Sequence, residues 1–99
     1  MRWQDTEAID RDEDWVESNF GVDEVGHDLF LDVRGRAQID FADVTFDNGE
    51  VQSIDLNEQV MGNGARRLLD FPGRRKVRAV QLVARSKGNE AGFRLYLSG

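Results

Sequence analysis

One stretch of the sequence, residues 39–56 (IDFADVTFDNGEVQSIDL), constrains the fold most strongly. In it, two runs of alternating apolar and polar residues flank the dipeptide Asn48-Gly49. Asn-Gly between such runs is a strong signal for a β-hairpin, because a tight primed turn needs residues that tolerate positive φ. In the first run the apolar phase changes between Ala42 and Asp43, which predicts a β-bulge or a strand covered on both faces. We therefore expect an antiparallel hairpin at the centre of the protein.

The rest of the chain repeats this period-two pattern in short segments separated by turn residues. The alternation is clearest at residues 29–33 and 91–97, where every second residue is apolar. Further strands are expected at 2–9, 14–20, 66–71 and 76–85, and turns or loops at 10–14, 21–26, 34–37, 62–64, 72–73 and 86–90. This spacing predicts an all-β, antiparallel sandwich of about eight strands, jelly-roll or Ig-like, in one domain covering residues 1–99.

Two segments leave a helix open as an alternative. Residues 5–17 contain no Gly or Pro, and Val77, Val80 and Ala84 also fit helical spacing. We favour strands in both, because the first segment has no clean 3.6-residue period and the second is rich in valine. The charged first strand is expected at an edge of the sheet, where charges discourage further pairing.

Composition excludes several classes of protein. The chain has no Cys, so it has no disulfide and no thiolate metal site. No apolar run approaches the ~20 residues that a membrane-spanning helix needs. The first ten residues are polar and acidic, so no signal peptide is expected in the chain as given. Export would require a leader removed upstream of Met1, and the compartment is left open.

Charge is distributed unevenly along the chain. Residues 1–60 contain 17 acidic residues against four Arg, a net charge of −13, and residues 61–99 contain two acidic against nine basic residues, a net charge of +7. The whole chain is therefore acidic, with a net charge of −6. Such asymmetry indicates either an acidic arm with a basic binding face, or two halves that pair in space and neutralise each other. We favour the second interpretation for a single small domain.

Several short motifs follow one another in a defined order: residues 9–12 (IDRD) with Asp14 and Val16, then 44–50 (VTFDNGE), then 69–73 (LDFPG) before a long valine-rich strand. In this order, and over nearly the whole chain, the sequence resembles a group of small bacterial β-sandwich domains of unknown function that often occur in exported proteins. These motifs are turn and core signatures, and the chain lacks the export signal that such proteins often carry. The resemblance implies a fold and no activity.

His27 is the only histidine and the only candidate for a catalytic base of the Ser-His type. A hydrolase of this type needs a nucleophile, a base and an orienting acid brought together. His27 lies in an expected Gly-flanked loop beside Asp28, so a base and an acid are adjacent. No serine lies in a nucleophile-elbow context; the serines are Ser18, Ser53, Ser86 and Ser98. We therefore favour a surface histidine, with a small hydrolase using His27 as an alternative.

Two acidic clusters could offer oxygen ligands to Ca²⁺. The first is the alternating set Asp10, Asp12 and Asp14, and the second lies around the hairpin turn and contains Asp43, Asp47, Asn48 and Glu50. EF-hand spacing fails, because Trp15 stands where that loop needs Gly and no Glu occupies its twelfth position. We expect solvated turn charges in both places, with a Ca²⁺-binding accessory module as an alternative.

The basic surplus could meet a polyanion, since cationic patches bind polyanions through counterion release. Its members are Arg66, Arg67, Arg74, Arg75, Lys76 and Arg78. Residues 74–78 contain no aromatic side chain suited to stacking on bases, so we do not expect nucleic-acid binding. We expect these residues to lie in a solvated turn or to face the acidic half.

Three aromatic residues, Trp3, Trp15 and Tyr96, could form a platform for a sugar, although such residues more often contribute to a core. The sequence as a whole predicts a non-enzymatic binding or structural module, with no catalytic residue, cofactor or metal site. A carbohydrate- or Ca²⁺-binding accessory module and the His27 hydrolase are the alternatives. The ligand, the partner and the oligomeric state are not specified by the sequence.

Overall fold

The computed structural model describes residues 3–10 and 14–99. This part of the chain contains six strands and no helix: β1 (Trp3–Asp10), β2 (Val16–Arg34), β3 (Ala37–Phe46), β4 (Val51–Met61), β5 (Gly64–Ser86) and β6 (Glu90–Ser98). All pairings are antiparallel, and the strands form one sheet in the order β1-β6-β2-β5-β3-β4. The prediction of an all-β antiparallel fold is confirmed. The chain forms a single sheet of six strands where a two-sheet sandwich of about eight was predicted.

The strand count differs because β2 and β5 are long and bent. They contain 19 and 23 residues, and the predicted loop at 21–26 and the predicted turn at 72–73 lie inside them. The pairing of β2 with β5 changes register between Gly21 and Glu24 and again between Gly26 and Asp28. Extra residues of this kind bend a strand and increase its twist without ending it. The turn-forming residues therefore bend two continuous strands.

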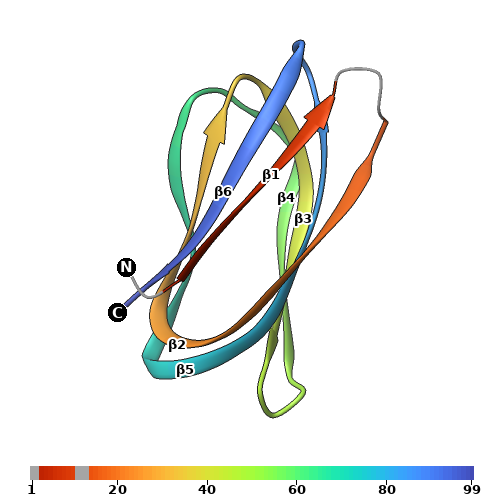
Figure 1. Cartoon of the computed structure of the whole chain (residues 1–99). Helices are drawn as coiled ribbons and strands as arrows, with labels where there is room; N and C mark the ends of the chain where they lie inside the picture. Colours follow the sequence, from red (N-terminus) through yellow and green to blue (C-terminus); the bar gives the residue numbers. More distant parts are fainter. Residues whose placement is uncertain (1–2, 11–13) are drawn as a thin grey trace.

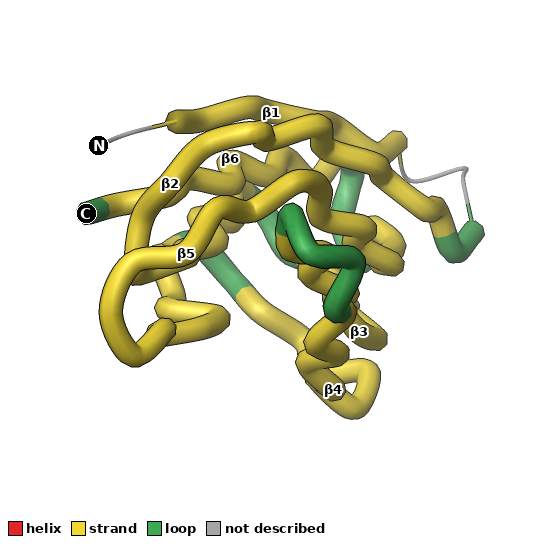
Figure 2. The backbone as a smooth tube through the Cα atoms, turned by 90° about the horizontal axis from the view of Figure 1, so that it is seen from below, coloured by secondary structure: helices red, strands yellow, loops and turns green. Residues whose placement is uncertain are grey.

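The bends fold the sheet over on itself, and Figure 1 shows β2 and β5 curving together at one end of the molecule. The β1-β6-β2 arm consists of β1, β6 and residues 28–34 of β2, with residues 64–70 of β5 beside them. The β3-β4 arm consists of β3, β4, residues 77–86 of β5 and residues 16–21 of β2. Figure 2 shows β1 and β6 on one side of the molecule and β3 and β4 on the other.

The hydrophobic core lies between the two arms, and its burial is the main force that closes the fold. Both arms contribute fully buried side chains, which include Leu29, Leu31, Leu95 and Leu97 from the first arm and Ile39, Val44, Phe46 and Leu82 from the second. Trp3 of β1 meets Phe20 of β2 edge to face, with ring centroids 6.4 Å apart. This contact ties the edge strand β1 to the opposite arm.

The described parts of both segments for which a helix was an alternative contain no helix. Of residues 5–17, 5–10 lie in β1, at an edge of the sheet as predicted, and 16–17 begin β2, while 11–13 lie outside the described residues; residues 76–85 lie within β5. Within the described part of the chain, the structure contains no apolar helix with the length required to span a bilayer.

The predicted central hairpin is confirmed as β3 and β4, but its turn is of another type. Phe46 N donates to Glu50 O at 2.9 Å, and Gly49 N donates to Phe46 O at 3.0 Å. Gly49 has a φ of 87°, whereas Asn48 is not among the residues with positive φ. A primed turn with Asn48 and Gly49 at its centre would need positive φ at Asn48, so the loop is a turn of ordinary hand closed by a left-handed glycine.

The predicted bulge is present in β3, but it lies earlier than the phase change suggested. The register shifts between Ile39 and Phe41, not between Ala42 and Asp43. As a result, Ile39 and Ala42 are fully buried while Phe41 is only partly buried on the other face. A bulge inserts one residue into the alternation, which exchanges the two faces from that point on.

Ion pairs join the acidic half of the sequence to the basic half, as we expected for a single domain. Among residues 3–10 and 14–99, four such pairs connect an arginine after residue 60 with an acidic residue before it: Arg67–Asp28, Arg75–Glu50, Arg85–Asp14 and Arg94–Asp32, at 3.6, 3.1, 3.5 and 3.5 Å. The folded sheet therefore brings the two charge blocks together.

Candidate functional site

The polar residues of the β1-β6-β2 arm gather on the face of the sheet that points away from the core, which we call the outer face. Successive residues of a strand point to opposite faces, so the buried positions 29, 31 and 33 place their neighbours outward. The outward residues of β2 are Asp28, Phe30, Asp32 and Arg34, and they pair across the sheet with Ser98, Tyr96, Arg94 and Gly92 of β6.

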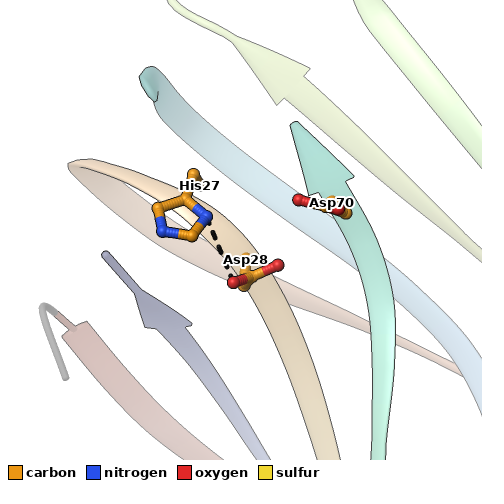
Figure 3. Close-up of side chains that lie close together, drawn as sticks. All are labelled: His27, Asp28 and Asp70. Atoms are coloured by element: carbon orange, nitrogen blue, oxygen red, sulfur yellow. Dashed lines mark ion pairs between the residues drawn. The ribbon is translucent and has the colours of Figure 1, made fainter. Parts of the chain in front are cut away.

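His27, Asp28 and Asp70 form a compact cluster at one end of this face, which we call the His27 centre (Figure 3). His27 Nδ1 lies 3.1 Å from Asp28 Oδ2. Asp70, on β5, is paired directly with Asp28 across the sheet. One nitrogen or oxygen atom from each residue lies within 4.8 Å of those from the other two. The side chains of His27 and Asp70 are 46% and 57% exposed, and that of Asp28 is 17% exposed.

The local fold explains why His27 points into this cluster. Gly26, just before it, packs so tightly against the end of β6 that a Cβ atom would lie 2.6 Å from Leu97 Cγ and 2.7 Å from Ser98 O. The register between β2 and β5 then shifts between Gly26, paired with Arg75, and Asp28, paired with Asp70, so His27 lies opposite the bulge formed by residues 71–74 of β5. A bulge redirects a side chain out of the regular alternation. The predicted loop position of His27 is therefore wrong, because the residue lies inside strand β2.

The two carboxylates of the His27 centre are only partly neutralised by nearby positive charge. Two carboxylates directly opposite each other on paired strands repel. Arg67 Nη1 approaches Asp28 Oδ1 at 3.6 Å and Asp70 Oδ2 at 4.0 Å, both beyond hydrogen-bond distance, and its side chain is 56% exposed. Asp28 Oδ1 is buried and has no hydrogen-bond partner among the described residues. The cluster thus has spare acceptor capacity for a cation.

The hydrolase alternative requires a serine hydroxyl bonded to His27. Ser98 is paired with Asp28 across the sheet, but no hydrogen bond between Ser98 and His27 is found in residues 3–10 and 14–99. Ser18 is buried and Ser53 donates to Asp43 Oδ1, so neither is placed to serve as the nucleophile. The acid and base that the sequence placed side by side are in contact, and the described structure does not add a nucleophile to them.

Several of the acidic residues predicted as alternative Ca²⁺ ligands make contacts within the fold. Asp14 pairs with Arg85, and Asp12 lies outside the described residues. At the hairpin, Asn48 Oδ1 accepts from Glu50 N, while Glu50 itself pairs with Arg75. Among the described residues, the only group with metal-ligand spacing is the His27 centre.

The predicted basic patch is divided among several partners. Arg66 donates to Gln59 and Arg67 belongs to the His27 centre. Arg75 lies over the ring of Phe46, 3.7 Å from its centroid, and pairs with Glu50. Arg78 donates to the backbone carbonyl oxygen of Asp47. Arg74 and Lys76 are exposed. Most of these side chains serve the fold, which agrees with the expectation that the basic residues face the acidic half.

The three predicted platform aromatics are not brought together. Trp3 packs against Phe20 at the edge of the core, and Trp15 lies beneath Arg85, whose Cζ is 4.8 Å from the ring centroid. Tyr96 lies on the outer face, stacked on Phe30 with centroids 4.9 Å apart and planes 10° from parallel. The three residues belong to different faces and arms of the sheet, so the alternative of a shared aromatic platform is not supported.

Sequence reasoning missed Phe30, Arg67 and Asp70 as members of the outer face. Phe30 carried a usable signal, since it is a large aromatic residue in the polar phase of an alternating strand. Arg67 and Asp70 carried none, because only the long-range pairing of β5 with β2 brings them to Asp28.

Comparison with known proteins adds one finding. A family model described as a domain of unknown function (DUF2541) matches residues 6–96. No curated protein matches the chain, and no solved structure does.

Proposed function

We propose, from the site of a chain that belongs to the DUF2541 family of domains of unknown function, that the protein is a non-enzymatic binding module that holds a divalent cation at the His27 centre. An imidazole nitrogen with two carboxylates suits Zn²⁺ and related transition-metal ions. Ca²⁺ and Mg²⁺ prefer sites made of oxygen alone. Three protein ligands leave one position of a tetrahedral ion open, through which the domain could bind a ligand group.

The observation that carries this proposal is the direct pairing of Asp28 with Asp70 beside His27. Evolved sheets place opposite charges in such pairs, because like charges destabilise the sheet. Here the guanidinium that approaches them within the described part of the chain, that of Arg67, stays beyond hydrogen-bond distance of both carboxylates. A cation between the three side chains would offset the repulsion. The exposure of His27 and Asp70 gives such an ion a route in from solvent.

The same geometry favours binding over hydrolysis. A Ser-His hydrolase needs its base hydrogen-bonded to a nucleophile, and the described residues supply only the acid and the base. In a cation site, His27 and Asp28 would both serve as ligands, and no nucleophile is required.

Isothermal titration of the whole chain with Zn²⁺ tests the proposal. We expect saturable binding of one ion per chain, and at least about tenfold weaker binding by Asp70→Asn, since the substitution removes one ligand's charge. Asp47→Asn is the matched control, because it makes the same chemical change at an exposed position in the β3–β4 turn. It should bind Zn²⁺ as the unmodified chain does.

Two outcomes would overturn the proposal. One is the lack of saturable Zn²⁺ binding by the unmodified chain, and the other is equal binding by Asp70→Asn and Asp47→Asn. Circular dichroism of each variant establishes that it is folded. Titration with Ca²⁺ provides the comparison of ions, and tighter binding of Ca²⁺ than of Zn²⁺ would contradict the role given to the imidazole.

A further inference from the structure

The outer face also carries an open hollow, at strand positions beyond the His27 centre and made of other residues. Its volume is about 560 Å³, within the ~300–1,000 Å³ typical of small-molecule sites. Residues of β1, β2 and β6 line it. Ala8 and Gly92 are directly paired across the sheet and form its floor.

Gly92 is the residue that keeps this hollow open. It lies inside β6, paired with Ala8 on one side and Arg34 on the other, without a register shift. Its φ is not positive, and a Cβ there would meet only Arg34 Cβ, at an ordinary contact distance of 3.7 Å. Neither backbone conformation nor packing therefore requires glycine. Glycine inside a strand weakens it and often marks a place where a ligand approaches the backbone.

The walls of the hollow present both hydrogen-bond donors and hydrogen-bond acceptors. Arg34 and Arg94 are donors, Asp32 is an acceptor, and the Thr6 hydroxyl is both. Asp32 and Arg94 form an ion pair, so Arg34 leaves these outward side chains with a single net positive charge, too little for a polyanion site. Neighbouring donors and acceptors of this kind are complementary to adjacent hydroxyl groups, each of which donates and accepts.

Arg94 is held in place before any ligand arrives. Its Cζ lies 4.7 Å from the ring centroid of Tyr96, its Nη2 is 3.5 Å from Asp32 Oδ2, and its Nη1 donates to Gln4 Oε1 at 3.4 Å. Tyr96 is in turn stacked on Phe30. Pre-positioned donors lower the entropic cost of binding. Because Arg94 and Phe30 both engage the ring of Tyr96, this tyrosine supports the arginine and offers no free ring face to a sugar.

We propose that this hollow binds a neutral saccharide through its hydroxyl groups. The floor of Ala8 and Gly92 lets a sugar ring lie close to the sheet. Arg34, Arg94, Asp32 and Thr6 contact the hydroxyls around it. This site shares no residue with the His27 centre, so each can fail without the other.

The test is an NMR titration of the ¹⁵N-labelled chain with glucose, galactose, mannose, N-acetylglucosamine and their β-linked disaccharides. We expect at least one to give saturable shifts of the Ala8, Arg34 and Gly92 amides. Gly92→Leu, which fills the hollow, should weaken this binding at least about tenfold. Gly21→Leu is the matched control, since Gly21 is also a strand glycine without positive φ and a Cβ there would meet nothing within 4 Å.

Arg34→Gln is the second variant and keeps the test decisive if Gly92→Leu does not fold. Arg34 is exposed, so its replacement should preserve the fold and weaken saccharide binding. Asp70→Asn should bind the saccharide unchanged, which separates this site from the His27 centre. The proposal is overturned if no sugar shifts these amides, if inorganic phosphate shifts them and the sugars do not, or if Gly92→Leu or Arg34→Gln binds as the unmodified chain does.

Discussion

At the scale of single residues, Arg67 determines how far the carboxylates of the His27 centre are neutralised when no metal is bound. Its guanidinium is the positive charge that approaches both Asp28 and Asp70, and it would compete with a bound cation. Arg67→Gln should therefore have two opposite effects. Without metal it should lower the free energy of unfolding by less than about 1 kcal/mol, because the arginine is largely exposed. With Zn²⁺ it should raise the affinity, because the competing charge is gone.

Thermal unfolding of Arg67→Gln with and without Zn²⁺ measures both effects. The neighbouring arginine offers a control: Arg66→Gln loses the same charge, but Arg66 bonds to Gln59 on β4 and not to the His27 centre. The Zn²⁺-induced increase in melting temperature should be larger for Arg67→Gln than for Arg66→Gln. Equal increases would show that Arg67 does not compete for this site.

Gly26 controls the position of His27 through packing. A Cβ at Gly26 would collide with Leu97 Cγ and with the backbone oxygen of Ser98, and the backbone cannot give way as a flexible side chain can. Gly26→Ala should lower the free energy of unfolding by about 1–3 kcal/mol, the usual cost of overpacking. Gly21→Ala, where the added Cβ meets nothing within 4 Å, should be neutral or slightly stabilising. Urea unfolding of both variants checks this, and equal stability would contradict the close approach of β2 to β6.

At the scale of single elements, β4 is an edge strand with an unusual interruption. Asn57 and Glu58 both have positive φ, 54° and 56°. The bulge that they form lies between the pairings of Ile39 with Gln59 and of Phe41 with Asp55. Left-handed conformations cost a residue with a Cβ roughly 1–2 kcal/mol. A kinked, charged edge discourages pairing with another chain, so the strain serves a purpose in the fold.

Relief of this strain is measurable. Glu58→Gly removes the Cβ that opposes positive φ, and it should raise the free energy of unfolding by up to about 1 kcal/mol, partly offset by the greater freedom of glycine in the unfolded chain. Glu58→Ala removes the same charge and keeps the Cβ, so it should give no such gain. Chemical denaturation distinguishes the two variants. If Glu58→Ala raised the free energy of unfolding as much as Glu58→Gly, the gain would come from loss of the charge and not from relief of backbone strain.

The elements also show which parts of the fold the sequence determines locally. Alternation at Leu29, Leu31 and Val33 predicted both the strand and its buried face, because period-two patterning is a local property. Pro72 and Gly73 gave an equally clear local signal for a turn, but in the structure they bend β5 without ending it. Whether such residues reverse a chain or bend it depends on whether a neighbouring strand bends alongside. The pairing of Asp28 with Asp70 depends on the same long-range register, which is why the His27 centre could not be predicted.

At the scale of the whole molecule, the two charge blocks of the sequence are interleaved in the sheet. The strand order β1-β6-β2-β5-β3-β4 places the two strands of the basic half, β5 and β6, between strands of the acidic half. The acidic half alone would keep one strand pair of the sheet, β3 with β4, and the basic half would keep none. Neither half can therefore bury the core without the other.

Cleavage of the chain between Gly62 and Asn63, in the connection from β4 to β5, tests this interdependence. Each fragment should be unfolded alone, and the mixture should recover the spectrum of the intact domain, because every pairing of β5 and β6 with the acidic half spans the cut. The fragments carry net charges of −13 and +7, so their association should be electrostatically steered. At 0.1 M salt the Debye length is about 10 Å, so charges farther apart are largely screened. The association rate measured by stopped-flow fluorescence should therefore fall steeply as salt is added. A fragment that folds alone would refute the interleaved sheet, whereas a rate that ignores salt would refute the steering and leave the sheet intact.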